Sequence, residues 1–162
     1  MIEVGFYKKE YHDAVVELIL DIQQREFGLP VTIKNQPDLL DIENVYCSGK
    51  GNFWVALDGL NLIGTIALID IGNRQAALRK MFVHHDYRGK KFGVGQLLLD
   101  TAIHWCNNMG IDEICLGTID LMTAAHKFYR RNGFTEVKKH DLPQKFPIMP
   151  VDNMFFRYNI KK

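Results

Sequence analysis

The chain has 162 residues, with 20 basic and 19 acidic side chains and a formal net charge of +1. This length fits one domain, and we expect residues 1–162 to form it. Hydrophobic residues make up 47% of the chain and charged residues 24%, a composition that excludes a disordered protein. The balanced charge also argues against nucleic acid or an anionic membrane as the partner of the whole surface.

The sequence shows neither a targeting pattern nor a metal-binding pattern. Its first residues lack the basic stretch and apolar core of a signal peptide, and no apolar run approaches the roughly 20 residues of a membrane helix. Cys47, Cys106 and Cys115 are an odd number without a CxxC spacing. His84 and His85 are adjacent, so on a strand they would face opposite sides and not share a metal. We therefore expect a cytoplasmic protein with reduced thiols and no metal.

The first half of the chain is predicted to place two helices between a first strand and a three-stranded meander. Val15, Leu18, Ile19 and Ile22 recur at the spacing of one helical face. The predicted elements are a strand over Ile2–Tyr7, helices over Glu10–Phe27 and Pro37–Val45, and strands over Phe53–Leu57, Leu62–Ile71 and Ala76–Val83, with turns at Asp58-Gly59 and Gly72-Asn73.

In the second half, helices alternate with strands. The predicted elements are helices over Gly95–Met109 and Leu121–Arg131, and strands over Glu113–Gly117, Phe134–Val137 and Asn153–Ile160. Pro143, Pro147 and Pro150 mark the connection to the last strand. The order β-α-α-β-β-β-α-β-α-β-β combines a meander with βαβ units. It predicts an α/β (α+β) fold with a mixed, mostly antiparallel central sheet and helices on both faces.

A basic, glycine-containing loop between a strand and a helix carries the densest chemical signal. Residues 79–98 read RKMFVHHDYRGKKFGVGQLL, so an apolar strand end leads into the loop and the loop opens a helix. Free backbone N–H groups and the helix dipole favour an anion at such a helix start. Neither a GxGxxG fingerprint nor a GxxxxGK[ST] loop is present, because Leu98 occupies the third glycine position of the first pattern. The segment predicts a phosphate site of another kind.

This segment resembles motif A of the GNAT superfamily of acetyl-CoA-dependent N-acyltransferases. The family pattern [QR]-x-x-G-x-[GA] follows a stretch similar to the residues 83–89, VHHDYRG. One register of the pattern starts at Lys90 and uses Gly93 and Gly95, and the other starts at Arg88; both stay open. Residues 125–134, AHKFYRRNGF, resemble the second family signature, A-x-x-x-Y-x-x-x-G-F. The resemblance covers the whole predicted element order.

The resemblance implies that acetyl-CoA lies between the strands Ala76–Val83 and Glu113–Gly117, where they splay apart. The pyrophosphate would rest on the loop, and the pantetheine arm would pair with the strand as an added strand does. The implied coenzyme-binding residues are Met81, Phe82 and Val83 of the strand, and Arg88, Gly89, Lys90, Lys91, Phe92, Gly93, Val94 and Gly95 of the loop and helix start.

Tyr129 matches the family tyrosine that often hydrogen-bonds the coenzyme sulfur, so it is the predicted catalytic residue. Because a phenol with a pKa near 10 protonates a thiolate only uphill, stabilising the leaving sulfur by a hydrogen bond is the expected role. The alternative is a core tyrosine packed beside Phe128.

The base that would deprotonate the acceptor amine is not identified by the pattern. Relatives carry a glutamate on the fourth strand, whereas residues 76–81 read AALRKM. Asp70, Glu26 and His84 stay possible through a water, and a weakly basic amine would need no base. The family also uses the region between the first two helices as the acceptor wall, so Glu26 and Asp38 are candidate substrate-binding residues.

The leading hypothesis is an N-acetyltransferase that transfers the acetyl group of acetyl-CoA to a primary amine, on a small molecule or a protein, by direct attack in a ternary complex. The alternative is a non-catalytic acyl-CoA-binding sensor of the same fold. We expect no nucleic-acid or membrane partner and a monomer or homodimer. The acceptor itself is set by loops, which the sequence does not place.

Overall fold

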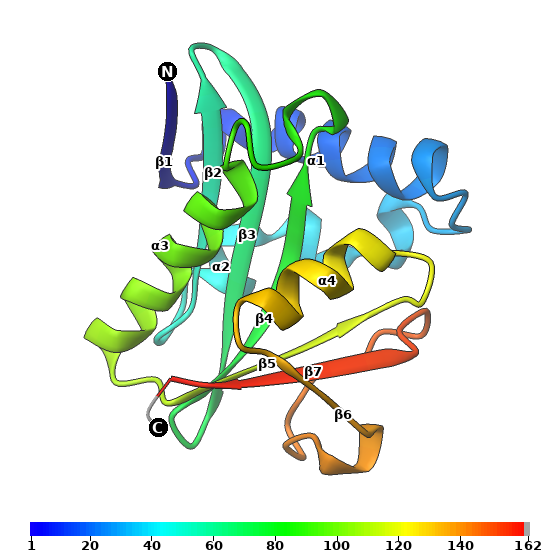
Figure 1. Cartoon of the computed structure of the whole chain (residues 1–162). Coiled ribbons are helices and arrows are strands. Elements are labelled where there is room, and N and C mark those ends of the chain that lie inside the picture. Colours follow the sequence, from blue (N-terminus) through cyan, green and yellow to red (C-terminus); the bar gives the residue numbers. More distant parts are fainter. Residues whose placement is uncertain (161–162) are drawn as a thin grey trace.

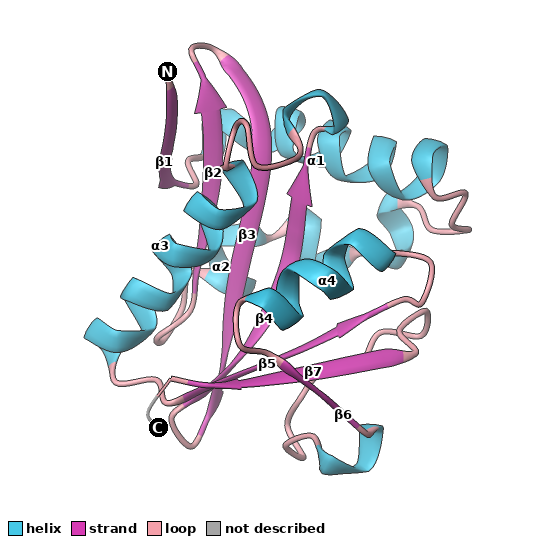
Figure 2. Cartoon of the chain, in the orientation of Figure 1, coloured by secondary structure: helices cyan, strands magenta, loops and turns pink. Residues whose placement is uncertain are grey.

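The computed structural model describes residues 1–160 and shows one seven-stranded sheet with helices on both faces (Figures 1 and 2). The strands are β1 (Ile2–Phe6), β2 (Asn52–Asp58), β3 (Asn61–Gly72), β4 (Gln75–Val83), β5 (Glu113–Thr118), β6 (Thr135–Val137) and β7 (Met154–Asn159). Their order in the sheet is β1-β2-β3-β4-β5-β7-β6, and β4–β5 is the parallel pair in this otherwise antiparallel sheet. The predicted fold class is confirmed.

The helices divide between the two faces of the sheet. The long helices are α1 (His12–Leu20), α3 (Val94–Met109) and α4 (Thr123–Arg131), and α2 (Ile42–Tyr46) is short. Figure 1 shows α3 and α4 in front of the sheet and α1 and α2 behind it. Leu98, Leu99 and Tyr129 join one buried core with β2–β5, whereas Val15 and Ile19 join a second core behind β2 and β3. Burial of these apolar side chains is the main force that holds both layers on the sheet.

The segment between α1 and β2 departs from the predicted helices. The first helix is α-helical only to Leu20, and Asp21–Glu26 continues in π-helical form. The predicted helix over Pro37–Val45 is two pieces, a 3₁₀ turn over Pro37–Leu40 and then α2, because the backbone of Asp41 is not helical, with φ −147° and ψ 50°. The apolar spacing does not reveal this break, because the buried residues of both pieces form one continuous apolar stripe.

The hairpin between β3 and β4 is also shifted from the predicted turn. Gly72 pairs with Gln75, so the two loop residues are Asn73 and Arg74 rather than Gly72 and Asn73, and both have the positive φ of a type I′ turn. Arg74 forms a bidentate ion pair with Asp112, which precedes β5. This contact ties the hairpin to the strand that pairs with β4.

Strands β4 and β5 are paired only at their beginnings. The register joins Gln75 to Glu113, Ala76 to Ile114 and Ala77 to Cys115, and then the strands diverge. Figure 1 shows β4 and β5 leaving this common point at a wide angle. Among residues 1–160, the β5-facing edge of β4 has no strand partner from residue 78 onward, so the backbone N–H and C=O groups that face this gap are available to a ligand.

Candidate active site

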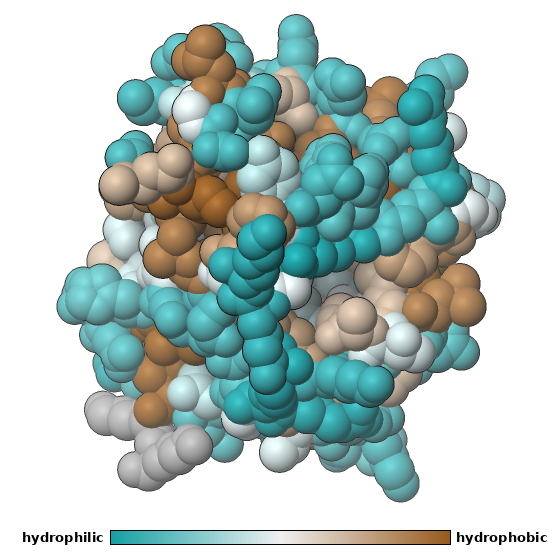
Figure 3. Space-filling model, turned by 45° about the horizontal axis from the view of Figure 1, so that its top comes forward, coloured by the Kyte–Doolittle hydropathy of each residue, from teal (hydrophilic) through white to brown (hydrophobic). Residues whose placement is uncertain are grey.

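A pocket of about 330 Å³ opens where β4 and β5 separate. Its walls come from both strands, from the segment that follows α1, from the start of α4 and from the loop before β7. The lining residues are Gln23, Leu29, Pro30, Val31, Asn35, Gln36, Leu78, Arg79, Lys80, Met81, Phe82, Leu116, Gly117, Thr118, Ile119, Met122, Ala125, Tyr129, Met149, Pro150, Val151 and Asp152. The space-filling view in Figure 3 shows a hollow near the middle of this face, bordered by hydrophilic and apolar side chains.

A β-bulge in β4 turns Lys80 into the wall of the pocket. Two residues, Lys80 and Met81, stand opposite Ile66 of β3, and Lys80 has a φ of +53°. Such a backbone is uncommon for a residue with a side chain and marks a site held by its surroundings. The Thr65 hydroxyl fixes the bulge by donating to the Lys80 carbonyl oxygen at 2.6 Å.

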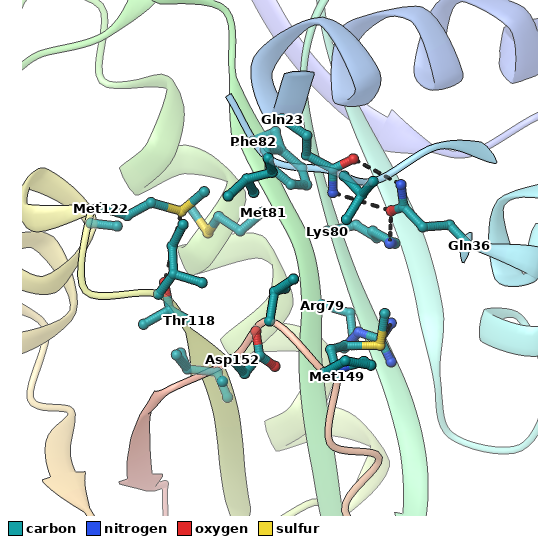
Figure 4. Close-up of a pocket in the computed structure, with 18 of the residues that line it drawn as sticks. Gln23, Gln36, Arg79, Lys80, Met81, Phe82, Thr118, Met122, Met149 and Asp152 are labelled. Carbon is teal, nitrogen blue, oxygen red and sulfur yellow. Dashed lines mark hydrogen bonds between the residues drawn. The ribbon is translucent and has the colours of Figure 1, made fainter. Parts of the chain in front are cut away.

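The Lys80 ammonium is buried and joins a side-chain network behind the pocket. Its Nζ donates to Gln36 Oε1 at 2.6 Å and lies 3.3 Å from Asp38 Oδ2. Asp38 also accepts a hydrogen bond from the Tyr46 hydroxyl at 2.5 Å, and Gln36 exchanges hydrogen bonds with Gln23 (Figure 4). Burial lowers the pKa of Lys80, and the Asp38 charge opposes this change. The network fastens residues 23–38 onto β4.

Glu26 and Asp38, the predicted acceptor-binding residues, are both engaged with other side chains. Glu26 forms a two-armed ion pair with Arg88, and the Arg88 hydrogen bond lowers the pKa of Glu26. Asp38 is paired with Lys80 and borders a second hollow on the far side of Arg79. Neither residue lines the main pocket, so their contact with an acceptor stays a prediction.

The other predicted bases also lie away from the pocket. Asp70 accepts hydrogen bonds from the backbone N–H groups of Gly72 and Lys50, which lower its pKa. His84 accepts a hydrogen bond from the backbone N–H of Asp86. None of the three predicted bases, Asp70, Glu26 and His84, lines the main pocket.

The expectation that His84 and His85 point in opposite directions is wrong. Strand β4 ends at Val83, and His85–Tyr87 forms a 3₁₀ turn, so the alternation of a strand does not apply. The two rings lie 4.3 Å apart, and ligand atoms of His84, His85 and Asp86 come within 4.8 Å of one another. The cluster is at the surface, outside the pocket.

The start of α3 presents free backbone N–H groups beside the end of β4. Gly93, at the N-cap, has a left-handed backbone with φ +63°, and Leu97 makes the first helical bond, to Gly93 O at 3.0 Å. The N–H groups of Val94, Gly95 and Gln96 therefore have no partner within the helix. Gly93 and Gly95 fall at this turn, as the register that starts at Lys90 requires.

The basic side chains of the loop differ in how far they are already occupied. Arg88 is held by Glu26 and by the Val83 carbonyl oxygen, to which its Nε donates at 2.9 Å. Lys90 and Lys91 are exposed and, among residues 1–160, form no ion pair, although Lys91 lies over the Phe92 ring. These two cations are therefore free to meet an anion at the helix start.

Tyr129 lies on α4, lines the pocket and is surrounded by aromatic rings. Its ring packs against Phe128, Phe134 and Phe156, and the residue is 6% exposed. Within the described part of the chain its hydroxyl has no hydrogen-bond partner, and burial raises its pKa. The phenol therefore stays protonated at neutral pH and can donate a hydrogen bond into the pocket, but it cannot act as a base.

Asp152 is the residue that sequence reasoning missed. It follows Pro150 in the loop before β7, and the side chain lies in the pocket between Thr118 and Arg79 (Figure 4). Burial raises the pKa of Asp152, while the charges of Arg79 and Lys80 oppose the increase. The only mark of Asp152 in the sequence is that an acidic residue stands directly before the last predicted strand. That this residue reaches the pocket depends on β7 lying next to β5, which the order of elements along the chain does not reveal.

The site can thus hold an extended ligand that runs from the α3 start, along the open edge of β4, into the pocket. No helix among the described residues is long and apolar enough to cross a membrane.

Comparison with known proteins assigns the family. The model of the acetyltransferase (GNAT) domain matches residues 49–136, which is more than half of the chain. An acetyltransferase of the GNAT family from Staphylococcus aureus Mu50 is 42% identical in a superposition that covers 99% of this chain and 100% of that one, with a TM-score of 0.96.

Two more distant proteins agree with this result. The probable N-acetyltransferase camello of Xenopus tropicalis is 32% identical over 131 residues, covering 76% of this chain and 58% of its own. The chain thus spans little more than half the length of the curated relatives it matches first. The PaiA N-acetyltransferase of Thermoplasma acidophilum, solved with coenzyme A, shares the fold, at 18% identity and a TM-score of 0.78 over 98% of this chain and 99% of that one. The chain belongs to the GNAT acetyltransferase family.

Proposed function

We propose that the protein transfers the acetyl group of acetyl-CoA to a primary amine, by direct attack of the amine in a ternary complex. The observation that carries this proposal is the continuous path between β4 and β5. Beyond Ala77 and Cys115 both strands have open edges, and these edges connect the free N–H groups of α3 to the pocket that contains Tyr129. A long coenzyme and a second substrate need such a path to meet.

The coenzyme end of the path suits a pyrophosphate and an amide-containing arm. The N–H groups of Val94, Gly95 and Gln96 would bind the pyrophosphate, with charge from Arg88, Lys90 and Lys91. The exposed Gly89, the half-buried Gly93 and the side chain of Phe92 form the rest of the loop. The backbone of Met81, Phe82 and Val83 would pair with the pantetheine arm, since this edge of β4 has no strand partner.

The chemistry at the pocket follows from the neutral Tyr129 hydroxyl. When the amine attacks the thioester carbonyl carbon, the C–S bond breaks and negative charge develops on the sulfur. A buried hydroxyl that has no partner among residues 1–160 and lies in an aromatic wall can donate a hydrogen bond to that sulfur. Its raised pKa makes complete proton transfer to the thiolate unfavourable, so we assign it to stabilisation of the leaving group.

The acceptor is proposed as a primary amine because the relative from Xenopus is described as a probable N-acetyltransferase. The pocket lining combines apolar side chains, such as Leu29, Val31 and Met122, with polar ones, such as Gln23 and Gln36. This mixture suits an amine with a short apolar body, and both a small molecule and a protein side chain fulfil that description.

The test combines coenzyme binding with turnover. Acetyl-CoA at 100 times its Kd should stabilise the fold by about 2.7 kcal/mol and raise Tm, whereas adenosine, which carries no phosphate, should have little effect. A screen of primary amines with acetyl-CoA, detected by thiol release, should then identify an acceptor. Stabilisation without thiol release from any amine would favour a sensor that binds acyl-CoA, and the absence of stabilisation would exclude the coenzyme site.

A further inference from the structure

The reaction requires an amine without its extra proton, and the pocket holds a single candidate group to remove it. A lysine-like amine with a pKa near 10.4 is neutral in about one molecule of 2,500 at pH 7. Among the residues that line the pocket, Asp152 is the one carboxylate, and neither histidine nor glutamate is present. The Lys80 Nζ is engaged by Gln36 and Asp38, the Arg79 guanidinium has no acceptor atom, and burial raises the pKa of Tyr129, so that it keeps its proton.

The backbone around Asp152 holds its carboxylate against the end of β5. The Asp152 N–H donates to Met149 O at 3.1 Å, and the next N–H, of Asn153, donates to Thr118 O at 2.9 Å. Strand β7 begins immediately afterwards, with Met154 opposite Thr118. The loop is therefore anchored on the strand that forms one side of the cleft.

Gly117 leaves the space that the Asp152 carboxylate occupies. A Cβ built on Gly117 would lie 2.5 Å from Asp152 Oδ2 and 3.0 Å from its Cγ, closer than real side chains approach. Gly117 has an ordinary β-strand backbone, so no turn geometry requires a glycine here. The absence of a side chain is explained by the carboxylate that lies over the strand.

The Asp152 carboxylate is less engaged than the other buried carboxylate near the site. Asp38 is held by Lys80 and Tyr46, whereas Asp152 forms no ion pair within residues 1–160, and the hydrogen bond to its carboxylate comes from the backbone of Met149. The Arg79 guanidinium donates to Met149 Sδ at 3.2 Å rather than to Asp152. A desolvated carboxylate with unused acceptor atoms can bind an ammonium group and accept its proton.

From these observations we infer that Asp152 is the catalytic base of the acetyl transfer, receiving a proton from the acceptor ammonium in the pocket between β4 and β5. The inference rests on the proposed function. The carboxylate takes one proton from the ammonium, and the neutral amine forms the N–C bond to the acetyl carbon. The C–S bond breaks with its electron pair on sulfur, and the second nitrogen proton ends on the coenzyme thiol. Asp152 returns its proton to solvent.

Burial supports this role, because it raises the pKa of Asp152 and makes the carboxylate a better base. The charged or titratable groups around it are Arg79 and Lys80 from β4 and Tyr129 from α4, with Asp38 behind Lys80. Activity should therefore rise with pH through the raised pKa of Asp152, where the basic form appears.

The experiment compares two acceptors of similar size in wild type and Asp152→Asn. Ethylamine is charged at pH 7 and needs a base, whereas trifluoroethylamine is mostly neutral. We expect kcat with ethylamine to fall by roughly 100–10,000-fold and kcat with trifluoroethylamine to fall by less than about 10-fold. The Tm increase with acetyl-CoA should be unchanged, and the acidic limb of the pH profile should disappear.

Two further variants separate the base from a structural effect. Gly117→Ala pushes the carboxylate away without changing its charge, so it should also slow ethylamine more than trifluoroethylamine. Asp120→Asn makes the same chemical change at an exposed position after β5 and should have no effect. An equal loss with both amines, a loss confined to KM, or unchanged kcat in Asp152→Asn would overturn the assignment. A wild type that releases no thiol with any amine would instead contradict the proposed function.

Discussion

In the proposed function, the two ends of the cleft would recognise their ligands with different parts of the chain. The coenzyme end is a continuous stretch, from the close of β4 to the first turn of α3, and it offers mainly backbone groups. The acceptor end is built from side chains of four separated segments, and its polar groups include Gln36, Lys80 and Asp152. A site made of backbone groups can bind the same coenzyme even when side chains change. A site made of side chains can change when the acceptor changes.

The strongest test of this comparison is Gly93→Val. A β-branched residue at φ +63° strains the turn and rotates the N–H groups behind it, although nothing lies within 4 Å of the added Cβ. We expect a folded protein whose affinity for acetyl-CoA is lower by roughly 100-fold, measured by calorimetry. Gly59→Val is the matched control, because Gly59 has a φ of +61° and equally open surroundings in the β2–β3 hairpin. Normal coenzyme affinity in Gly93→Val would mean that the pyrophosphate binds elsewhere.

Tyr129→Phe tests the point where the two ends meet. The change removes one hydroxyl and keeps the aromatic packing with Phe134 and Phe156. We expect kcat to fall by roughly 10–100-fold, at the lower end of acid-type assistance, because a thiolate needs little help to leave. The Kd of acetyl-CoA should stay within a few-fold. Tyr11→Phe, outside the pocket, should have the kcat of wild type. An unchanged kcat in Tyr129→Phe, measured where chemistry limits the rate, would show that the Tyr129 hydroxyl does not stabilise the leaving sulfur.

Lys80→Met should disrupt the side-chain network at the acceptor end and leave the coenzyme end unchanged. It leaves Asp38 without its cation in a site where the Asp38 side chain is only 13% exposed. We expect a loss of about 2–4 kcal/mol in the free energy of unfolding and a fall in Tm of roughly 5–15 °C.

The loss in Lys80→Met should be accompanied by a higher KM for the acceptor and a nearly unchanged Kd for acetyl-CoA. Lys127→Met, at an exposed position on α4, provides the control for removing a lysine charge. A variant as stable as wild type would show that the buried network does not hold residues 23–38 in place.

Glu26→Gln gives the smallest expected effect and tests whether the two ends compete for one side chain. Arg88 is paired with Glu26 at a partly exposed site, so the pair contributes about 0.2–1 kcal/mol. Releasing Arg88 should tighten acetyl-CoA binding by up to roughly 5-fold. The bridging hydrogen bond lowers the pKa of Glu26, so its carboxylate stays charged through the neutral range and the effect should be constant there. Glu17→Gln, exposed on α1, should bind as wild type does; weaker binding in Glu26→Gln would mean that Glu26 orients Arg88 for the coenzyme.

The difference between the coenzyme end and the acceptor end also explains how much of the site could be predicted from the sequence alone. The glycines at the start of α3, the strand before them and Tyr129 lie in contiguous patterns, so their elements and order were predictable. The acceptor end depends on contacts across 44 residues, such as Lys80 to Gln36, which no local pattern records. Asp152 was missed because the position of its carboxylate over Gly117 follows from the sheet order, with β7 inserted between β5 and β6.

Local conformation was hardest to predict where tertiary contacts override helical preference. The apolar spacing through Ile22 continues into the π-helical segment, so the change of helix type left no mark on the pattern. His84 and His85 were misjudged because strand alternation was applied to two residues that lie beyond the end of the strand at Val83. In both places the backbone changes within one or two residues, which is finer than hydrophobic periodicity resolves.

The short parallel pairing of β4 with β5 has a consequence for the lifetime of the protein. Among the described residues, only three ladder pairs join β4 to β5, and beyond them the two groups of strands are held together by side-chain packing. We expect this gap to open locally at a lower free energy than global unfolding requires. A coenzyme that spans the gap would add bonds to both groups and suppress this opening. Degradation by proteases, which attack the opened chain, should then slow as acetyl-CoA becomes abundant, so the amount of enzyme would follow the supply of its acetyl donor.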